Sequence, residues 1–264
     1  MSKYETFARL HDDFLILPNA WDAGSARLMQ HAGAKAIATS SAAVAWTHGY
    51  ADGEAMPPAL ALQTVRAIVD ATDLPVSADI EAGYAADANA AAARALEVLD
   101  AGAVGINIED GTGAPDLLAA KIEAIQNAAR SKGTQIWINA RVDVFLKGIM
   151  KGEEGLKESI RRGQLYASAG ANSIFVPAVV DAASLKELTG NIRLPLNVLA
   201  WGGLPDAATL KSLGVKRLSA GSGIALRTND LAHSLAQAFL ADGKSEHMAG
   251  ATLTNPALNG IMRK

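Results

Sequence analysis

The 264-residue chain contains no cysteine. This absence excludes disulfide bonds, thiolate metal ligands and a cysteine nucleophile. An excess of positive charge is also missing, because 24 Lys and Arg residues face 27 Asp and Glu residues, for a net charge of -3. Such a balance gives no electrostatic reason to expect nucleic acid or an anionic membrane as a partner, and it favours a small molecule.

Long apolar runs are absent as well. No stretch approaches the roughly 20 apolar residues that span a bilayer, and residues 1–5 lack the pattern of a secretory signal. We therefore expect a cytoplasmic protein with no membrane partner. Half of the residues are nevertheless hydrophobic and 19% are charged, which is enough apolar material for a compact core.

Short β-rich apolar runs alternate with alanine-rich segments of helical period along the whole chain. The runs lie at residues 14–17, 36–39, 76–80, 105–108, 136–140, 173–176, 196–200 and 217–220, and the helical segments include 23–31, 60–71, 88–100, 116–131, 155–169 and 207–213. Nearly continuous apolar strands joined by helices indicate a parallel sheet covered on both faces. Eight such units favour a closed (β/α)8 barrel, a TIM barrel, over an open doubly wound sheet.

The chain predicts one α/β domain rather than two. The alternative open sheet lacks a dinucleotide fingerprint in its first unit. We assign residues 1–241 to the barrel and residues 242–264, whose pattern is weaker, to a C-terminal tail or arm that packs on the barrel or on a partner subunit.

Polar side chains gather where three neighbouring predicted strands end, which is where barrels hold their chemistry. Side chains two residues apart on a strand share a face. The pairs that share a face are Asp79 and Glu81, Asn107 and Glu109, and Asn139 and Arg141. Burying three acids together is costly unless a cation neutralises them. Their oxygen ligands suit Mg2+ or Mn2+, whereas the five histidines are scattered and form no zinc-type cluster.

The same residues also have plainer interpretations. The acids could pair with Arg141 or cap helices, and Arg141 could hold a substrate carboxylate, a structural acid or both. Ser40 and Ser41 could be caps or could direct N–H groups toward that carboxylate. Asn197 lies on the same rim and could form a wall of the pocket. Lys147 is the one lysine near a strand end, several residues into a loop, so Schiff-base chemistry is not expected.

In combination, these segments resemble the phosphoenolpyruvate mutase and isocitrate lyase superfamily. The resemblance runs up to the eighth strand and is carried by residues 17–22, 51–54, 77–84, 105–110 and 139–143. It implies that Asp79 ligates Mg2+ directly and that Asp52, Glu81 and Glu109 hold the waters of the ion. It also implies substrate binding by Ser40, Ser41, Asp79 and Arg141, to which Asn197 is added from its place on the rim. Arg141 and Asp52 are the catalytic candidates.

The chain departs from this superfamily in the loop after the fourth strand. Residues 109–116 are too few for the gating loop that carries a cysteine acid in isocitrate and methylisocitrate lyases. In the mutase and in phosphonopyruvate hydrolase that loop brings lysine and asparagine, which are not found here. Ala38 and Ala178 stand where relatives often have an aromatic residue and a glutamate. These differences argue against both lyases and against phosphonate chemistry, and they indicate an altered specificity.

The sequence therefore predicts a Mg2+-dependent lyase or decarboxylase that acts on a small 2-oxo acid, such as oxaloacetate, through a metal-stabilised pyruvate enolate. Three alternatives stay open: a barrel that binds 2-oxo acids without turnover, a phosphonopyruvate-type hydrolase or mutase that cleaves a P–C bond, and a phosphate-binding isomerase or aldolase built on the glycines of residues 221–223. The resemblance also implies a homo-oligomer, a dimer or tetramer that exchanges its last helix, residues 224–240.

Overall fold

The computed structural model describes residues 1–263 and contains one parallel sheet. The strands are β1 (Leu15–Leu17), β2 (Asn19–Ala20), β3 (Ile37–Thr39), β4 (Val76–Asp79), β5 (Gly105–Glu109), β6 (Trp137–Arg141), β7 (Ser173–Phe175), β8 (Leu196–Leu199) and β9 (Arg217–Ser219). They follow the order β1-β9-β8-β7-β6-β5-β4-β3-β2. The order shows that both ends of the sheet come from the first stretch of the chain.

The sheet closes through β1 and β2, which are two halves of one barrel strand separated by Pro18. β1 pairs with β9 and β2 pairs with β3. Proline has no N–H to donate to a ladder, but its carbonyl accepts a hydrogen bond from the Ala38 N–H at 3.0 Å. The nine segments therefore form the eight-stranded barrel that the sequence predicts, in a single α/β domain.

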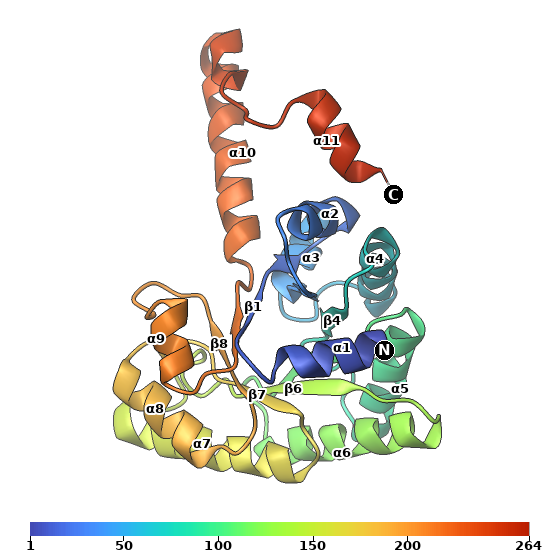
Figure 1. Ribbon diagram of the computed structural model, residues 1–264, viewed down its shortest axis with the longest axis vertical. Helices are drawn as coiled ribbons and strands as arrows, with labels where there is room; N and C mark the ends of the chain where they lie inside the picture. The colour runs from blue at the N-terminus through green and yellow to red at the C-terminus, as the bar shows by residue number, and fades with distance from the viewer. Residues whose placement is uncertain (264) are drawn as a thin grey trace.

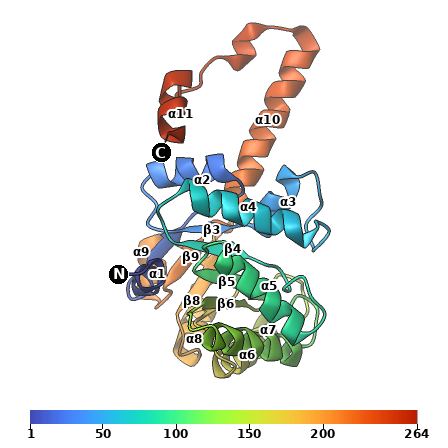
Figure 2. The same ribbon diagram turned by 90° about the vertical axis from the view of Figure 1, so that its right-hand side faces the viewer.

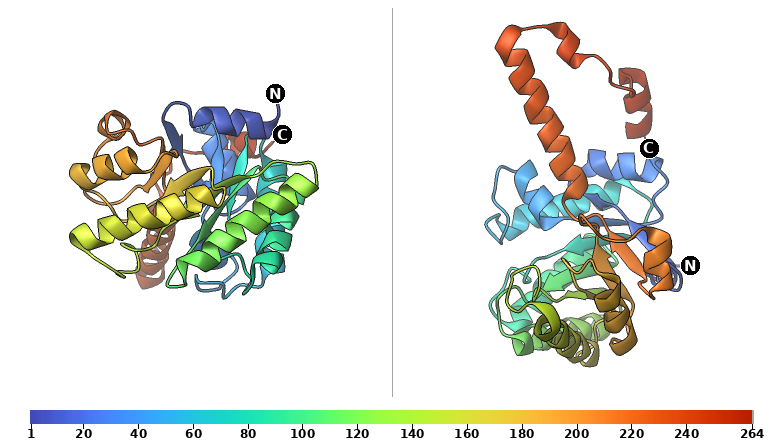
Figure 3. Two further views of the ribbon diagram at one scale, coloured as in Figure 1. Left: turned by 90° about the horizontal axis from the view of Figure 1, so that it is seen from below. Right: turned by 90° about the vertical axis from the view of Figure 1, so that its left-hand side faces the viewer.

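Helices surround the sheet (Figure 1; Figure 3, left). In chain order the helices are α1 (Lys3–Leu10), α2 (Ala23–His31), α3 (Ser41–Thr47), α4 (Pro58–Ala71), α5 (Ala88–Asp100), α6 (Pro115–Ser131), α7 (Gly152–Ser168), α8 (Ala182–Asn191), α9 (Ala207–Ser212), α10 (Gly223–Asp242) and α11 (Asn255–Met262), with a 3-10 turn η1 (Ser245–Met248) before the last, and α10 and α11 lie apart from the ring of helices around the sheet (Figure 1). Aspartates cap the first turns of α2, α5, α8 and α9. Each cap satisfies an N–H that the helix itself leaves unpaired, and so fixes where the preceding loop ends.

The N-terminal helix α1 covers the end of the barrel at which the strands begin. Its Phe7 is fully buried and packs edge-on against Trp137, the first residue of β6, with ring centroids 5.9 Å apart. His11, just after α1, stacks on the same indole at 4.2 Å. Because this end is closed by packed rings, access to the barrel interior is left to the opposite end, where the strands finish.

Helix α10 leaves the barrel instead of packing on it. Figures 1 and 2 show α10 projecting from the end of β9 and the tail returning toward α2. Ala225 is its one buried residue, whereas Leu226, Leu231 and Phe239 are exposed by 51%, 59% and 45%. The tail is held by the Arg27 guanidinium, which donates to the Arg263 carbonyl at 2.9 Å. Among the residues that the structure describes, no helix has the length and apolar character needed to span a membrane.

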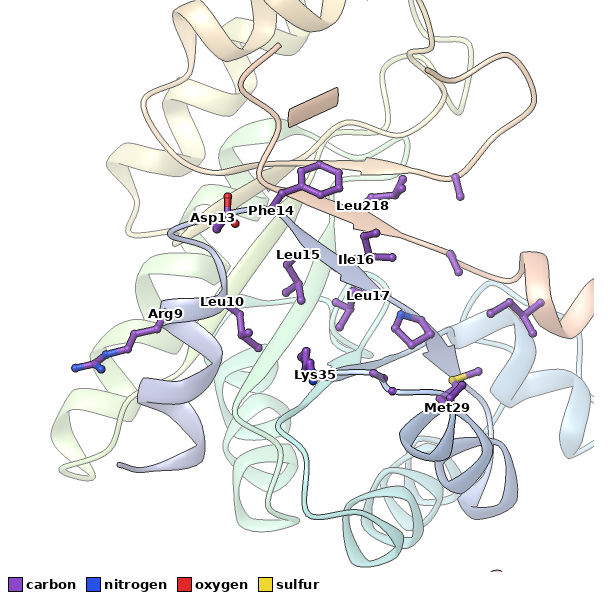
Figure 4. A pocket seen from close by; sticks show the side chains of 17 residues that line it. Arg9, Leu10, Asp13, Phe14, Leu15, Ile16, Leu17, Met29, Lys35 and Leu218 are labelled. Atoms are coloured by element: carbon purple, nitrogen blue, oxygen red, sulfur yellow. The ribbon is translucent and has the colours of Figure 1, made fainter. Parts of the chain in front are cut away.

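The departure of α10 leaves a groove on the outer face of β1 and β9. The groove has a volume of about 710 Å³ and is bordered by α1, α2 and the start of α10 (Figure 4). Ile16 of β1 stands in it beside its pairing partner Leu218 of β9, and Ile16 is 59% exposed. Outer faces of barrel strands are normally covered by helices, so this face lacks its cover within one chain.

Candidate active site

A second cavity, of about 190 Å³, opens at the C-terminal ends of the strands. Its lining residues are Asn19, Ser40, Ser41, Ala42, Asp52, Asp79, Asn107, Arg141, Leu146, Lys147, Phe175, Pro177, Leu199, Trp201, Ser219, Gly221 and Ser222. Five of the predicted site residues, Ser40, Ser41, Asp52, Asp79 and Arg141, are thus brought to one cavity. The larger groove beside β1 lies away from these groups and is lined mainly by apolar side chains.

Asp79 is fixed at the end of β4 by the start of α3. Its Oδ2 accepts hydrogen bonds from the Ser41 N–H at 3.3 Å and the Ser41 hydroxyl at 3.1 Å. Its Oδ1 accepts from the Glu81 N–H at 3.3 Å. The neighbouring Ser40 is the cap of α3 and accepts from the Ala43 N–H. The cap interpretation of Ser40 is therefore confirmed, and Ser41 orients the predicted metal ligand.

Glu81 and Glu54 join two loops of the rim through Tyr84. The Glu81 carboxylate accepts from the Tyr84 hydroxyl and from the Glu54 N–H, both at 2.6 Å, and Glu54 accepts from the Tyr84 N–H at 2.7 Å. All three residues have positive φ, of 52°, 58° and 49° respectively for Glu81, Glu54 and Tyr84. Such backbone strain is kept only where surrounding contacts fix it. The clasp holds the exposed loop of Asp52 against the β4 rim.

Arg141 is clamped by two carboxylates. Its Nη1 lies 2.5 Å from Glu109 Oε2, and its Nε and Nη2 donate to the two oxygens of Asp143 at 2.7 and 2.9 Å. The pairing of the predicted acids with Arg141 that the sequence left open is therefore confirmed for Glu109. A guanidinium has five N–H donors, and three are used here. Two donors are left for a ligand in the cavity that Arg141 lines.

Behind Arg141 lies a buried network that the sequence did not reveal. Asp110 Oδ1 accepts from the Asp143 N–H at 2.9 Å. Asp110 Oδ2 accepts from Arg162 at 2.9 Å and from the Tyr166 hydroxyl at 2.6 Å. Arg162 and Tyr166 are four residues apart on α7, so they share one helix face. The four-residue spacing of Arg162 and Tyr166 could have indicated this shared face, but it does not identify Asp110 as the acid that both side chains contact.

The floor of the cavity is polar. Asn107 of β5 accepts from the Asn139 amide at 2.8 Å and from Arg217 Nη2 at 3.2 Å. Arg217 is fully buried, and its Nε and Nη1 have no partner among the described residues. Burial lowers the pKa of Arg217, with Asp79 opposing, but a guanidinium keeps its charge at neutral pH. Asn197 is also fully buried, accepts from the Ser219 hydroxyl at 3.2 Å, and does not line the cavity. Its contact with a substrate stays a prediction.

The acids of the rim are short of positive charge. Burial raises the pKa of the Asp79, Glu81 and Glu109 carboxyl groups, and the neighbouring acids raise the pKa of Glu81 and Glu109 further, although Arg141 opposes the shift at Asp79 and Glu109. A cation placed among them would relieve this repulsion. The oxygen-only donor set fits Mg2+ or Mn2+.

The positions of the rim acids fit an ion that has few direct protein ligands. Within residues 1–263, no three His, Cys, Asp or Glu side chains are grouped closely enough to hold a metal. Glu81 and Glu109 do not line the cavity and already have hydrogen-bonded or charged partners. Mg2+ commonly keeps several waters and uses one or two carboxylates. The predicted arrangement, with Asp79 as the direct ligand, is compatible with these positions.

The glycines at residues 221–223 do not form a free phosphate cradle. The Gly221 N–H already donates to the Asn19 side chain at 2.8 Å. Gly221 has φ of +55°, and an added Cβ would lie 2.6 Å from Leu199 Cδ1. Tight turning and close packing therefore account for this glycine. The connection between β5 and α6 spans only residues 110–114, which confirms that the loop after the fourth barrel strand is short.

Comparisons with known proteins agree with this fold. A family model described as phosphoenolpyruvate phosphomutase matches residues 7–240. Over 211 residues the chain is 36% identical to the uncharacterized protein Rv1998c of Mycobacterium tuberculosis (strain ATCC 25618 / H37Rv), covering 78% of this chain and 77% of that protein. Over 208 residues it is 31% identical to 2-methylisocitrate lyase of Bacillus subtilis (strain 168), covering 73% of this chain and 65% of that enzyme. A crystal structure from Burkholderia cenocepacia J2315, described provisionally as a phosphonomutase, is 40% identical with a TM-score of 0.85, covering 89% of this chain and 99% of that one.

Proposed function

Because the chain belongs to the phosphoenolpyruvate phosphomutase family, we propose that it is a Mg2+-dependent lyase or decarboxylase that cleaves a small 2-oxo acid through a pyruvate enolate. Its superfamily consists of lyases and mutases, and the chain is an enzyme of this superfamily. The observation that carries the proposal is the group of acids at the barrel mouth, Asp79, Glu81 and Glu109, whose pKa values are raised by burial, with Arg141 paired to Glu109. Oxaloacetate is the simplest candidate substrate.

Mg2+, when bound, would supply a Lewis acid for the oxygen that becomes negative as the carbon–carbon bond breaks. Asp79 would hold the ion directly, with Asp52, Glu81 and Glu109 around its waters. Ser41 keeps Asp79 oriented through two hydrogen bonds. A site prepared in this way needs little reorganisation when charge develops.

Arg141 binds and orients the substrate in this proposal. Its clamp by Glu109 and Asp143 fixes the plane of the guanidinium, and its two remaining N–H donors can hold a carboxylate or the developing enolate oxygen. In the cleavage of oxaloacetate the C3–C4 bond breaks, carbon dioxide leaves, and C3 then takes a proton. Asp52, on an exposed loop that lines the cavity, is the candidate for moving that proton to C3.

Oxalate, a planar mimic of the pyruvate enolate, tests this proposal. Calorimetry of EDTA-treated protein should show oxalate binding that requires Mg2+ and is lost in Asp79→Ala. Asp73→Ala, which changes an exposed aspartate outside the cavity, is the matched control and should bind normally. Oxalate binding that ignores the metal, or that survives in Asp79→Ala, would show that the carboxylates are structural.

Catalysis is tested separately with oxaloacetate. The Mg2+-loaded protein should release pyruvate faster than Mg2+ alone, and Arg141→Met should abolish the difference. The short connection of residues 110–114 favours one further candidate, a barrel that binds 2-oxo acids without turning them over. Tight Mg2+-dependent oxalate binding without pyruvate release from oxaloacetate or from 4-substituted 2-oxo acids would select that second function.

We also propose that a second copy of the chain fills the groove beside β1 with its own α10, as a dimer or within a tetramer. α10 exposes Leu226, Leu231 and Phe239, and the groove exposes Ile16. Both surfaces are apolar, so burying one against the other would remove both from water. Exchange of an identical element between protomers is also a low-cost route to a dimer. In this arrangement the barrel of residues 1–241 is completed by a partner, and residues 242–264 form an arm.

Light scattering tests the assembly. The wild type should be a dimer or tetramer, and a variant with both Leu231→Asp and Phe239→Asp should dissociate. Arg227→Asp, on the same exposed helix, is a control that changes charge without removing an apolar contact. A monomeric wild type would contradict the exchange. The cytoplasmic location expected from the sequence stays a prediction that microscopy of a tagged chain would test.

A further inference from the structure

Lys147 lines the cavity and has no role in the function proposed above. It lies in the segment of residues 142–151 that joins β6 to α7. Four charged residues line the cavity: Asp52, Asp79, Arg141 and Lys147. Among residues 1–263, the Lys147 ammonium forms no ion pair, whereas Arg141 pairs with two acids. The charge of Lys147 is therefore available to a ligand.

Arg141 cannot neutralise a second anionic group on a substrate. Glu109 and Asp143 already occupy three of its five N–H donors. The remaining donors suit one carboxylate or one enolate oxygen. A substrate with two carboxylates would leave one of them without a cation unless Lys147 took part.

Lys147 stands on a short turn that is tied to this clamp. Its N–H donates to the Asp143 carbonyl at 2.8 Å, and the Ile149 N–H donates to the Val144 carbonyl at 2.9 Å. Asp143 and Val144 are both fully buried. The backbone that carries Lys147 is therefore anchored directly after the residue that grips Arg141. The side chain of Lys147 is exposed, whereas the turn that carries it is anchored by these two hydrogen bonds.

No other lining residue can replace Lys147 as a second cation. The lining residues that carry no charge include Leu146, Phe175, Pro177, Leu199 and Trp201. These five are apolar or present only an indole N–H, and apart from Asp52, Asp79 and Arg141 the remaining polar lining residues are uncharged serines and asparagines. The short connection of residues 110–114 brings no lysine or arginine to the mouth.

We propose that Lys147 binds the second carboxylate of a four-carbon diacid and so makes the site select diacids over monoacids. The inference rests on the proposed function, since the first carboxylate and the adjacent oxygen must lie at the metal end. The ammonium donates hydrogen bonds to the distal carboxylate without a covalent step. Lys147 is thus a residue that determines specificity.

Malate and 2-hydroxybutyrate test the assignment, because they differ only by a carboxylate against a methyl group and neither is a 2-oxo acid that can lose carbon dioxide. We expect Mg2+-loaded wild type to bind racemic malate about tenfold or more tightly than racemic 2-hydroxybutyrate, as one charge-assisted hydrogen bond would give. Lys147→Met should abolish this preference while oxalate binding still requires Mg2+, and Lys147→Arg should restore part of the preference. Lys151→Met, on the same segment but outside the cavity, should behave as wild type.

The outcomes separate the two proposals. A malate preference that survives in Lys147→Met, or a wild type that binds oxalate with Mg2+ but shows no malate preference, overturns the role of Lys147 alone. A wild type that fails to bind oxalate with Mg2+ overturns the proposed function and this inference with it. Lys147 is exposed, so the variants should fold, and circular dichroism checks that they do.

Discussion

Replacing Tyr166 with Phe isolates one contact of the network behind Arg141. Tyr166 is fully buried on α7, and its hydroxyl donates to Asp110 Oδ2 at 2.6 Å. Asp110 keeps two other donors, the Arg162 guanidinium and the Asp143 N–H, both at 2.9 Å. The substitution removes one oxygen atom and keeps the ring, so packing changes little.

The expected cost follows from the kind of bond that is lost. A hydrogen bond to a charged group contributes about 1.5–3 kcal/mol, and leaving a buried partner unsatisfied lies in the same range. We therefore expect Tyr166→Phe to lower the free energy of unfolding by about 2 kcal/mol. Oxalate affinity should stay close to that of wild type, since the remaining donors keep Asp110 and Asp143 in place.

Urea unfolding of wild type, Tyr166→Phe and Tyr50→Phe measures the effect. Tyr50 is 37% exposed, so its substitution reports what loss of a solvent-facing hydroxyl does. A difference between Tyr166→Phe and wild type below about 0.5 kcal/mol, the scatter expected of a surface change, would refute the argument. Asp110→Ala leaves Arg162 buried without this partner and should cost more, about 3–5 kcal/mol, and should weaken oxalate binding because Asp143 loses its anchor.

Three further predictions concern other parts of the molecule. Burial lowers the pKa of His11 from 6.5 to about 3, so between these values the unfolded state binds a proton that the folded state does not. Urea unfolding should show wild type losing about 0.7 kcal/mol between pH 7 and 6 and about 1.2 kcal/mol between pH 6 and 5 relative to His11→Phe, and parallel curves would contradict this. Tyr84→Phe should loosen the clasp and speed hydrogen exchange of residues 48–57, with unchanged exchange counting against the clasp. Gly102→Ala places a Cβ 2.7 Å from Val69 Cγ1 at φ of +95° and should cost about 1–3 kcal/mol in thermal unfolding; an unchanged melting temperature would contradict it.

The sequence was sufficient for the barrel because alternation of strand and helix is a local signal repeated eight times. The predicted strands end within one residue or so of the observed ones, as β5 and β6 show. Helix α1 was not predicted, since only Phe7 among its eight residues is buried. The break at Pro18 was also missed, although proline without an N–H gave the signal. The direction taken by α10 is not encoded locally, because Ala225 is its one buried residue and little packing ties the helix to the barrel.

The rim was predicted as far as strand register allows. Glu109 and Arg141 sit opposite each other on β5 and β6, so their pairing follows from the register of two adjacent parallel strands. The contact of Asp110 with Tyr166 joins residues 56 positions apart and depends on the rotation of α7 about its axis, which spacing does not fix. The clasp of Glu54 with Tyr84 depends on positive φ at residues that are not glycine, which composition does not predict.

An open mouth bears on which reaction the site supports. The connection of residues 110–114 is short, and two residues that line the cavity, Asp52 and Trp201, are exposed, so the cavity opens to water. Transfer of a phosphoryl group to or from an enolate needs water excluded, because a reactive intermediate is otherwise hydrolysed or protonated. Release of pyruvate from a diacid ends in protonation at C3, which water can assist. The short loop therefore supports cleavage of a carbon–carbon bond over rearrangement of a phosphonate, and it accounts for how the chain could dispense with a cysteine acid.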